Sequence, residues 1–450
     1  MRINCFYYLR TLLFLLIFLS LFAGSARANR RISLSQNQLF EDKEDVFLFP
    51  ELALEYRNVL SLDLGGNARE GRLLFLGGWE SLALGLAAYN SAAIAPYNYV
   101  FANPIAGDIV SYETFALYQG AVSPVPFPVS TIGSLWADAQ PFSVVDGFIS
   151  VPMGNGLFGA RLGLGTRADI EFFEDHDNDS GIAETFVTLE AGLSGKGTVR
   201  YDTSLNVTLD FGNVQNETIP NPIDPYNLLA SAVTYDEASG TLIRASLSGR
   251  GYFPFAEKIE VGVLGNLVFT NAALEKDPQG EDPETDEPYV EVTENIMGIA
   301  FFGGAGPVYR IAEDTTIGGY GLLGLAYATQ DPNDTRNDDS WSDLMFYLPA
   351  VRVAADIGIT NWFFLRGGLQ YSFQIAMTSL DEYYQDEFGR AETIHKRDGS
   401  FSWSAGLGIE HEGFTLDGAL QHALLTAGPS FIGGSSPGMF VVVSAGYHWL

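Results

Sequence analysis

An acidic stretch in the first half of the chain combines residue types and spacing that could bind a metal ion. Asp175, Asp177 and Asp179, with Glu184 behind them, place carboxylates at alternating positions. Hard oxygen ligands at this spacing suit Ca²⁺, although the glycine comes one place later than an EF-hand loop requires. The four residues are therefore a candidate calcium site, and a solvated acidic loop is the alternative.

The other reactive residue types form no catalytic pattern. None of the five histidines stands near a serine in a recognised nucleophile motif. The only cysteine, Cys5, precedes an apolar run near the start of the chain, so a zinc site has almost no support. We therefore expect the protein not to be an enzyme and to carry no cofactor other than the candidate Ca²⁺.

A third group consists of charged residues within otherwise apolar alternating stretches. Period-two alternation places these charges on the face opposite the apolar residues. One interpretation is a water-filled, ion-selective channel. The other, which we favour because buried charges must be paired, is a salt-bridge network across a closed or plugged lumen. The expected lumen-lining residues are Arg161, Arg167, Arg200, Arg244, Arg250, Arg352, Asp356 and Arg366.

The elements that carry these charges are predicted strands. In residues 362–377, Leu365, Leu369 and Phe373 share one face, and Arg366 and Gln370 lie on the other. Residues 199–211 and 158–172 repeat the scheme, as do several later stretches. So many repeats indicate a lipid-facing band around a polar interior.

Connection lengths support the same fold. Short links, such as those at residues 154–156, 360–361 and 412–413, alternate with long polar ones, such as 213–240 and 378–400. Short turns at one end and long loops at the other are typical of an outer-membrane barrel with periplasmic turns. We predict an all-β, antiparallel up-and-down barrel of about 14 strands (14 to 16), with a soluble sandwich or barrel as the alternative.

Composition restricts the class of protein further. The net charge of −31 argues against nucleic acid as a partner. Residues 1–28 form a predicted signal peptide with cleavage after Ala28, and no later apolar run approaches the ~18 residues of a membrane helix. Hydrophobic residues nevertheless make up 47% of the chain and charged ones only 18%, which favours a closed transmembrane barrel in the outer membrane of a Gram-negative cell.

The sequence divides into three parts. The signal peptide is followed by a polar, acidic segment at 29–57, which we expect to be periplasmic or to plug the lumen. The transmembrane barrel occupies 58–450. Its insertion at 90–141 is aromatic and apolar, so we expect it to cover the mouth or enter the lumen.

Two stretches resemble known outer-membrane proteins. The C-terminal strand, 439–450, resembles the closing strand of Gram-negative outer-membrane barrels, with Trp449 next to last. The run from Asp45 to Ala53 resembles, in part, the N-terminal signature of the long-chain fatty-acid transporter family: Pro50 matches, and Phe49 replaces an asparagine. The resemblance implies a barrel of about 14 strands, a luminal plug with Phe47, Phe49 and Pro50 in its motif, and diffusion of hydrophobic compounds.

The expected function follows mainly from this resemblance. It is outer-membrane transport of small hydrophobic compounds by passive diffusion through a plugged barrel. A general diffusion porin, and a structural or surface-interaction barrel, are the alternatives. The expected partners are outer-membrane lipid, the barrel-assembly machinery through the C-terminal strand, and a small hydrophobic ligand.

Overall fold

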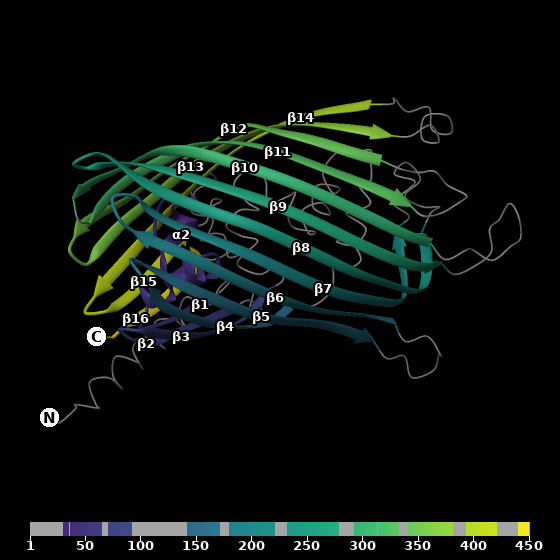
Figure 1. The fold of residues 1–450 in the computed structure, drawn as a ribbon, viewed down its shortest axis with the longest axis horizontal. Helices are drawn as coiled ribbons and strands as arrows, with labels where there is room; N and C mark the ends of the chain where they lie inside the picture. The colour runs from purple at the N-terminus through teal and green to yellow at the C-terminus, as the bar shows by residue number, and fades with distance from the viewer. Residues whose placement is uncertain are drawn as a thin grey trace, which may run out of the picture.

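The protein folds as a closed barrel in which each strand pairs antiparallel with its sequence neighbours (Figure 1). The computed structural model describes residues 30–35, 37–64, 71–91, 142–171, 180–220, 232–278, 292–312, 314–332, 341–380, 393–420 and 440–449. The predicted signal peptide, most of the 90–141 insertion, and Asp175, Asp177 and Asp179 lie outside these ranges. The topology confirms the prediction of an all-β up-and-down barrel; its sixteen strands are at the upper end of the predicted range, above the 14 that the resemblance implied.

The sixteen strands follow one another around the ring in chain order. They are β1 (Val59–Leu64), β2 (Gly71–Trp79), β3 (Leu82–Ser91), β4 (Phe142–Met153), β5 (Gly156–Glu171), β6 (Ser180–Lys196), β7 (Arg200–Pro220), β8 (Ala232–Ala256), β9 (Ile259–Pro278), β10 (Val292–Ala312), β11 (Thr315–Pro332), β12 (Trp341–Thr360), β13 (Phe363–Leu380), β14 (Thr393–His411), β15 (Phe414–Leu420) and β16 (Phe440–His448). Within residues 30–58, as far as the structure describes them, three short helical turns precede the strands: α2 (Arg30–Ser33), η1 (Lys43–Phe47) and η2 (Pro50–Leu54). No helix among the described residues is long and apolar enough to cross a bilayer.

The ring closes where the first strand meets the last. β1 pairs with β16 from Val59 opposite His448 to Leu64 opposite Val443. The Trp449 backbone N–H donates to the Asn58 carbonyl at 3.0 Å, and the Trp449 ring stacks on Phe75 of β2 with centroids 5.8 Å apart. Backbone and aromatic contacts therefore both hold the seam.

Tight turns gather at the end of the barrel where the described chain begins and ends (Figure 1). The link between β14 and β15 consists of Glu412 and Gly413, whose φ angles are 49° and 82°. Positive φ at both central residues is the geometry of the hairpin turn that matches strand twist, and Gly413 adopts it without the Cβ penalty.

Several strands are longer than the alternation predicted. β7 runs to Pro220 and β8 begins at Ala232, inside the stretch 213–240 that we interpreted as a loop. A tilted strand needs only about 9–11 residues to cross the bilayer core, whereas β8 has 25. Beyond the lipid, both faces of a hairpin meet water, so polar sequence without alternation still forms strand there. The prediction of loops at these positions was wrong for that reason.

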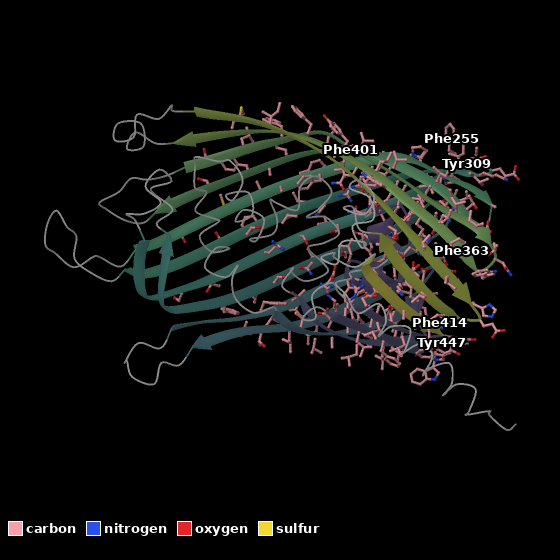
Figure 2. The ribbon with its side chains drawn as sticks, turned by 180° about the vertical axis from the view of Figure 1, so that it is seen from behind. Phe255, Tyr309, Phe363, Phe401, Phe414 and Tyr447 are labelled. Atoms are coloured by element: carbon pink, nitrogen blue, oxygen red, sulfur yellow. The ribbon has the colours of Figure 1, made fainter. Side chains whose placement is uncertain are left out.

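The outward face of the barrel is an apolar band (Figure 2). Large aliphatic and aromatic side chains are about half exposed around the ring, among them Leu86, Leu162, Leu205, Leu247, Phe301, Leu323, Val353 and Leu369. Exposed aromatic residues, including Phe255, Tyr309 and Tyr447, gather toward the short-turn end (Figure 2). Soluble proteins rarely expose so much contiguous apolar surface, whereas a lipid-facing band flanked by aromatic residues is the outer surface of a membrane barrel.

Candidate functional site

Residues 30–57 lie inside the barrel at its short-turn end, and we call the described residues of this segment the plug (Figure 1). α2 packs on β13, β14 and β15, while η2 packs on β3 to β6. Phe47, Glu51 and Ala53 have no exposed surface. The plug therefore extends from one side of the wall to the other.

The sequence of the plug favours two tight turns. Asp42 caps η1: its side chain accepts from the Glu44 backbone N–H, and Asp45 reaches back to accept from the Asp42 backbone N–H at 3.1 Å. This reciprocal arrangement satisfies backbone donors at the start of the helix. Pro50 then opens η2, where its missing N–H costs no hydrogen bond.

The second half of the plug is anchored by an apolar core. Phe47 and Phe49 are buried with the inward residues Leu76 and Phe148. The rings of Phe47 and Phe148 meet edge to face, with centroids 5.4 Å apart. Such aromatic pairs add stabilisation beyond the area that they bury.

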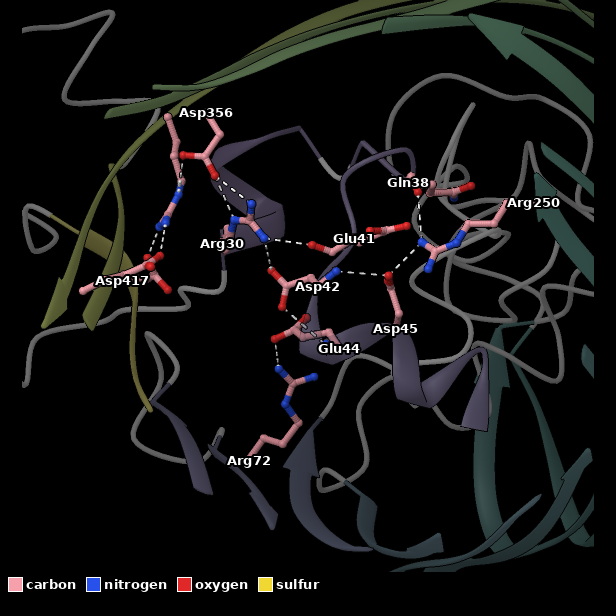
Figure 3. A network of polar contacts seen from close by, with 12 residues as sticks. Arg30, Gln38, Glu41, Asp42, Glu44, Asp45, Arg72, Arg250, Asp356 and Asp417 are labelled. Atoms are coloured by element: carbon pink, nitrogen blue, oxygen red, sulfur yellow. Dashed lines mark hydrogen bonds and ion pairs between the residues drawn. The ribbon is translucent and has the colours of Figure 1, made fainter. Parts of the chain in front are cut away.

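Arg250 of β8 anchors the middle of the plug. Its guanidinium lies 2.7 Å from Asp45 of the plug and donates to the Gln38 carbonyl at 3.2 Å (Figure 3). It also lies 2.7 Å from Asp202 of β7. The same guanidinium lies over the Phe49 ring, 4.9 Å from its centroid. A buried arginine paired twice in this way is expensive to separate from its partners.

Arg72 of β2 anchors the plug beside the barrel seam. Its guanidinium pairs with Glu44 of the plug and with Asp63 of β1, and Asp63 also accepts from the Ser444 hydroxyl of β16. The Arg72 guanidinium also lies over the Phe47 ring. One carboxylate thus links the plug anchor to the strands that close the ring.

The first residues of the plug are paired on the opposite side. Arg30 lies 2.8 Å from Asp356 of β12 and donates to the Glu41 carbonyl at 2.8 Å (Figure 3). Burial would lower the pKa of the Arg30 guanidinium, but Asp42 and Asp356 outweigh that effect and hold the pKa above its ordinary value. Asp356 also pairs with Arg366 of β13 at 3.1 Å.

Two further wall arginines contact the plug. Arg161 of β5 donates to the Phe47 carbonyl and lies 3.0 Å from Glu190 of β6, with both side chains buried. Arg200 of β7 lies 2.6 Å from Glu41 of the plug. The wall therefore holds the plug through charge-assisted contacts from β2, β5, β7, β8 and β12.

Glu51 differs from the other charged residues of the plug. Its side chain is fully buried, and its carboxylate oxygens find no hydrogen-bond partner on neighbouring residues that the structure describes. Burial raises the pKa of Glu51 to about 9, and nearby Asp202 and Glu190 act in the same direction. The carboxyl is therefore protonated at neutral pH.

The structure brings most of the predicted lumen residues together. Arg161, Arg200, Arg250, Asp356 and Arg366 belong to the network around the plug. Arg244 and Arg352 are buried on β8 and β12. The side chains of Arg167 and Glu184 are outside the described part of the structure, as are the other three calcium candidates.

Sequence reasoning missed the acidic partners of this network. Glu41, Glu44 and Asp45 of the plug, and Asp63 and Arg72 of the first two strands, were not among the expected site residues. The one available signal was the density of acids at residues 41–45, just before the first strand. Those acids complement the inward arginines.

A group of buried apolar side chains faces inward on β9 to β12, next to the plug. We call Leu264, Val268, Ala300, Phe302, Leu322, Ala326 and Ala350 the apolar wall patch; all are buried on β9 to β12 and belong to one cluster with Leu39 of the plug. Leu39 packs close to Gly262 near the start of β9. From there the patch runs along the strands, away from the short turns.

The adjoining part of the wall is polar. β6 to β8 carry Thr188, Ser204, Asn206 and Thr208, with Ser248, on the corresponding inward positions. Lumens of membrane barrels are ordinarily polar, so the apolar wall patch is the unusual feature. The inward face of the wall is therefore apolar on β9 to β12 and hydrogen-bonding on the adjoining strands β6 to β8.

Fold and outward face together define the class: the protein is a transmembrane β-barrel of the outer-membrane type with a plugged lumen. No family model and no curated protein matches the chain.

Solved structures resemble it at low identity. The CymD monoaromatic hydrocarbon channel is 9% identical over 95% of this chain and 98% of its own, with a TM-score of 0.37. The Pseudomonas putida toluene transporter TodX is 8% identical over 94% and 93%, with a TM-score of 0.34. The ferric yersiniabactin uptake receptor FyuA of Yersinia pestis is 8% identical over 88% and 80%, with a TM-score of 0.37.

Proposed function

We propose that the protein is a non-enzymatic transport protein of the Gram-negative outer membrane, which lets small hydrophobic compounds cross by passive diffusion. The observation that carries the proposal is the apolar wall patch, which begins at Leu39 of the plug and lines β9 to β12. An inward apolar surface contributes nothing to the lipid contact of the barrel. It suits a compound that leaves water to enter the lumen.

The electrostatics of the plug argue against bulk ion flow. Arg30, Arg72, Arg161 and Arg250 are each paired with carboxylates or carbonyls of the plug and wall. Paired charges largely cancel, so they produce little electrostatic potential in the lumen to attract ions, unlike the charged rings of ion-selective pores. A plugged lumen with an apolar side favours uncharged or weakly polar compounds.

The outer face supports the proposed location. The apolar band needs lipid, and the predicted signal peptide provides export. The outer leaflet of a Gram-negative cell is a poor solvent for hydrophobic compounds, so a protein route is useful there.

Uptake of the hydrophobic dye N-phenyl-1-naphthylamine by Gram-negative cells tests the proposal. Cells that express the protein should take up the dye faster than cells with an empty vector. Leu322→Gln, which places an amide within the apolar wall patch, should slow uptake. The matched control Asn206→Ser, on the polar wall, should not. Equal uptake with and without the folded protein would refute the proposal.

A further inference from the structure

Two inward glycines lie where the backbone of the plug packs directly on the wall. At Gly159 of β5, an added Cβ would lie 2.2 Å from the Glu51 nitrogen and 2.4 Å from the Pro50 carbonyl carbon. At Gly368 of β13, it would lie 2.5 Å from the Ser35 hydroxyl oxygen and 2.7 Å from the Leu34 carbonyl carbon. Real Cβ atoms essentially never approach so closely, and at both glycines at least one of the atoms met is plug backbone, which cannot swing aside.

Hydrogen bonds hold the plug at both places. Beside Gly159, the Ser150 hydroxyl donates to the Glu51 carbonyl at 2.5 Å. Beside Gly368, the Ser404 hydroxyl donates to the Ser33 carbonyl at 2.8 Å and accepts from the Ser35 backbone N–H at 2.9 Å. Each glycine therefore lies in a seat where wall and plug backbones are joined by specific polar contacts.

The two seats face each other across the lumen. In the ring of sixteen strands, β5 and β13 are half a turn apart. A plug that is fixed at both seats crosses the lumen from β5 to β13. The ion pairs of Arg250 and Arg72 hold the part of the plug that lies between the two seats.

We propose that Gly159 and Gly368 are positioning residues that keep the plug seated across the lumen, and that the seated plug prevents ions from flowing through the barrel. The inference goes beyond the proposed transport function, because it concerns the seal and not the compound that crosses. A methyl group at either seat must lift the plug backbone from the wall.

Other inward glycines offer a graded comparison. At Gly262 an added Cβ would meet only the Leu39 side chain, and at Gly406 mainly that of Ser33. Flexible side-chain ends can move, so Gly262→Ala should disturb the seal less than Gly159→Ala. Gly321 of β11 is exposed and does not face the plug; an added Cβ there meets nothing within 4 Å, which makes Gly321→Ala the neutral control.

Ion current through the refolded protein in a planar bilayer tests the inference. The wild type and Gly321→Ala should stay closed, whereas Gly159→Ala and Gly368→Ala should lose the seal and conduct, with circular dichroism confirming the barrel. Silent, folded Gly159→Ala and Gly368→Ala barrels would overturn the proposal, as would a wild type that conducts as well as they do. Dye uptake tests the proposed transport function separately, so either proposal can be refuted without the other.

An engineered disulfide provides a measurement that does not depend on those variants folding. The Ser35 and Ser404 hydroxyl oxygens lie 2.9 Å apart, and the chain's only cysteine is Cys5, in the predicted signal peptide. Ser35→Cys combined with Ser404→Cys should cross-link fully under oxidation and stay silent to ions. A folded barrel that fails to cross-link, or that conducts when cross-linked, would contradict a seated plug.

Discussion

Replacing Glu51 with glutamine should tighten the plug at neutral pH. When the plug is undocked, this carboxyl has the ordinary pKa of 4.5; in the docked plug, burial raises the pKa to about 9. An acid whose pKa is raised by docking binds its proton more tightly in the docked state. Docking is therefore strongest below pH 4.5, weakens as pH rises from there to 9, and then levels off.

The magnitude at pH 7 follows from the same two pKa values. Keeping Glu51 protonated over the 2.5 pH units between 4.5 and 7 costs docking about 3 kcal/mol, at roughly 1.4 kcal/mol per unit. Glu51→Gln keeps the shape of the side chain and removes its ionisation, so the variant avoids this cost. The docked plug should gain about three-hundredfold in its equilibrium with the undocked state.

Hydrogen exchange of the backbone amides of η2 measures that equilibrium. The Leu52, Glu55 and Tyr56 amides, which donate to the Phe49 and Leu52 carbonyls, should exchange about three-hundredfold more slowly in Glu51→Gln than in wild type at pH 7. At pH 4.5 the two proteins should agree.

Glu55→Gln is the matched control, because it removes a partly exposed ion pair with Lys196. Such pairs contribute about 0–1 kcal/mol, so exchange in this variant should change by less than about tenfold. Equal exchange of wild type and Glu51→Gln at pH 7 would show that the buried carboxyl does not oppose docking.

Two further pairs of variants test the wall. Leu369→Arg, on the lipid face, should lower the free energy of unfolding in vesicles by about 2–4 kcal/mol. Its control, Gln370→Ser on the inward face, should have little effect, and similar losses in the two variants would contradict the assignment of faces. Arg161→Met leaves Glu190 buried without its ion-pair partner and should lower the free energy of unfolding by about 3–5 kcal/mol. Adding Glu190→Gln should recover part of that loss. A double variant as unstable as Arg161→Met would show that the buried charge is not the cause.

The class of fold could be predicted because one physical rule operates along most of the chain. Inside the bilayer the wall is one strand thick, with lipid on one side and the lumen on the other, so period two separates Leu369 from Arg366 and Leu162 from Arg161. The rule stops applying beyond the lipid. That is why the ends of β7 and β8, where both faces are wet, were interpreted as loops.

The contacts of the plug could not be predicted in this way. Arg72 joins Glu44 of the plug to Asp63 of β1; the β1–β2 pairing places Arg72 beside Asp63, but nothing in the alternation shows where the plug folds. The seats at Gly159 and Gly368 were also beyond prediction, because an inward glycine in a strand has the same local pattern whether or not a backbone packs on it. The acids at 41–45 indicated that the segment needs cations, but not which ones.

The pairing of β1 with β16 imposes an order on biogenesis. The final hydrogen bonds of the wall, from Val59 opposite His448 onward, require β16, which is synthesised after the other strands of the ring. Until then both margins of the growing sheet have unpaired backbone groups, which the hydrocarbon cannot satisfy. The plug precedes β1 and is held beside the seam by Arg72 and Asp63, so it must be in position by the time the ring closes. A chain that lacks its last ten residues would thus lose closure and the enclosure of the plug together, and not merely one strand in sixteen.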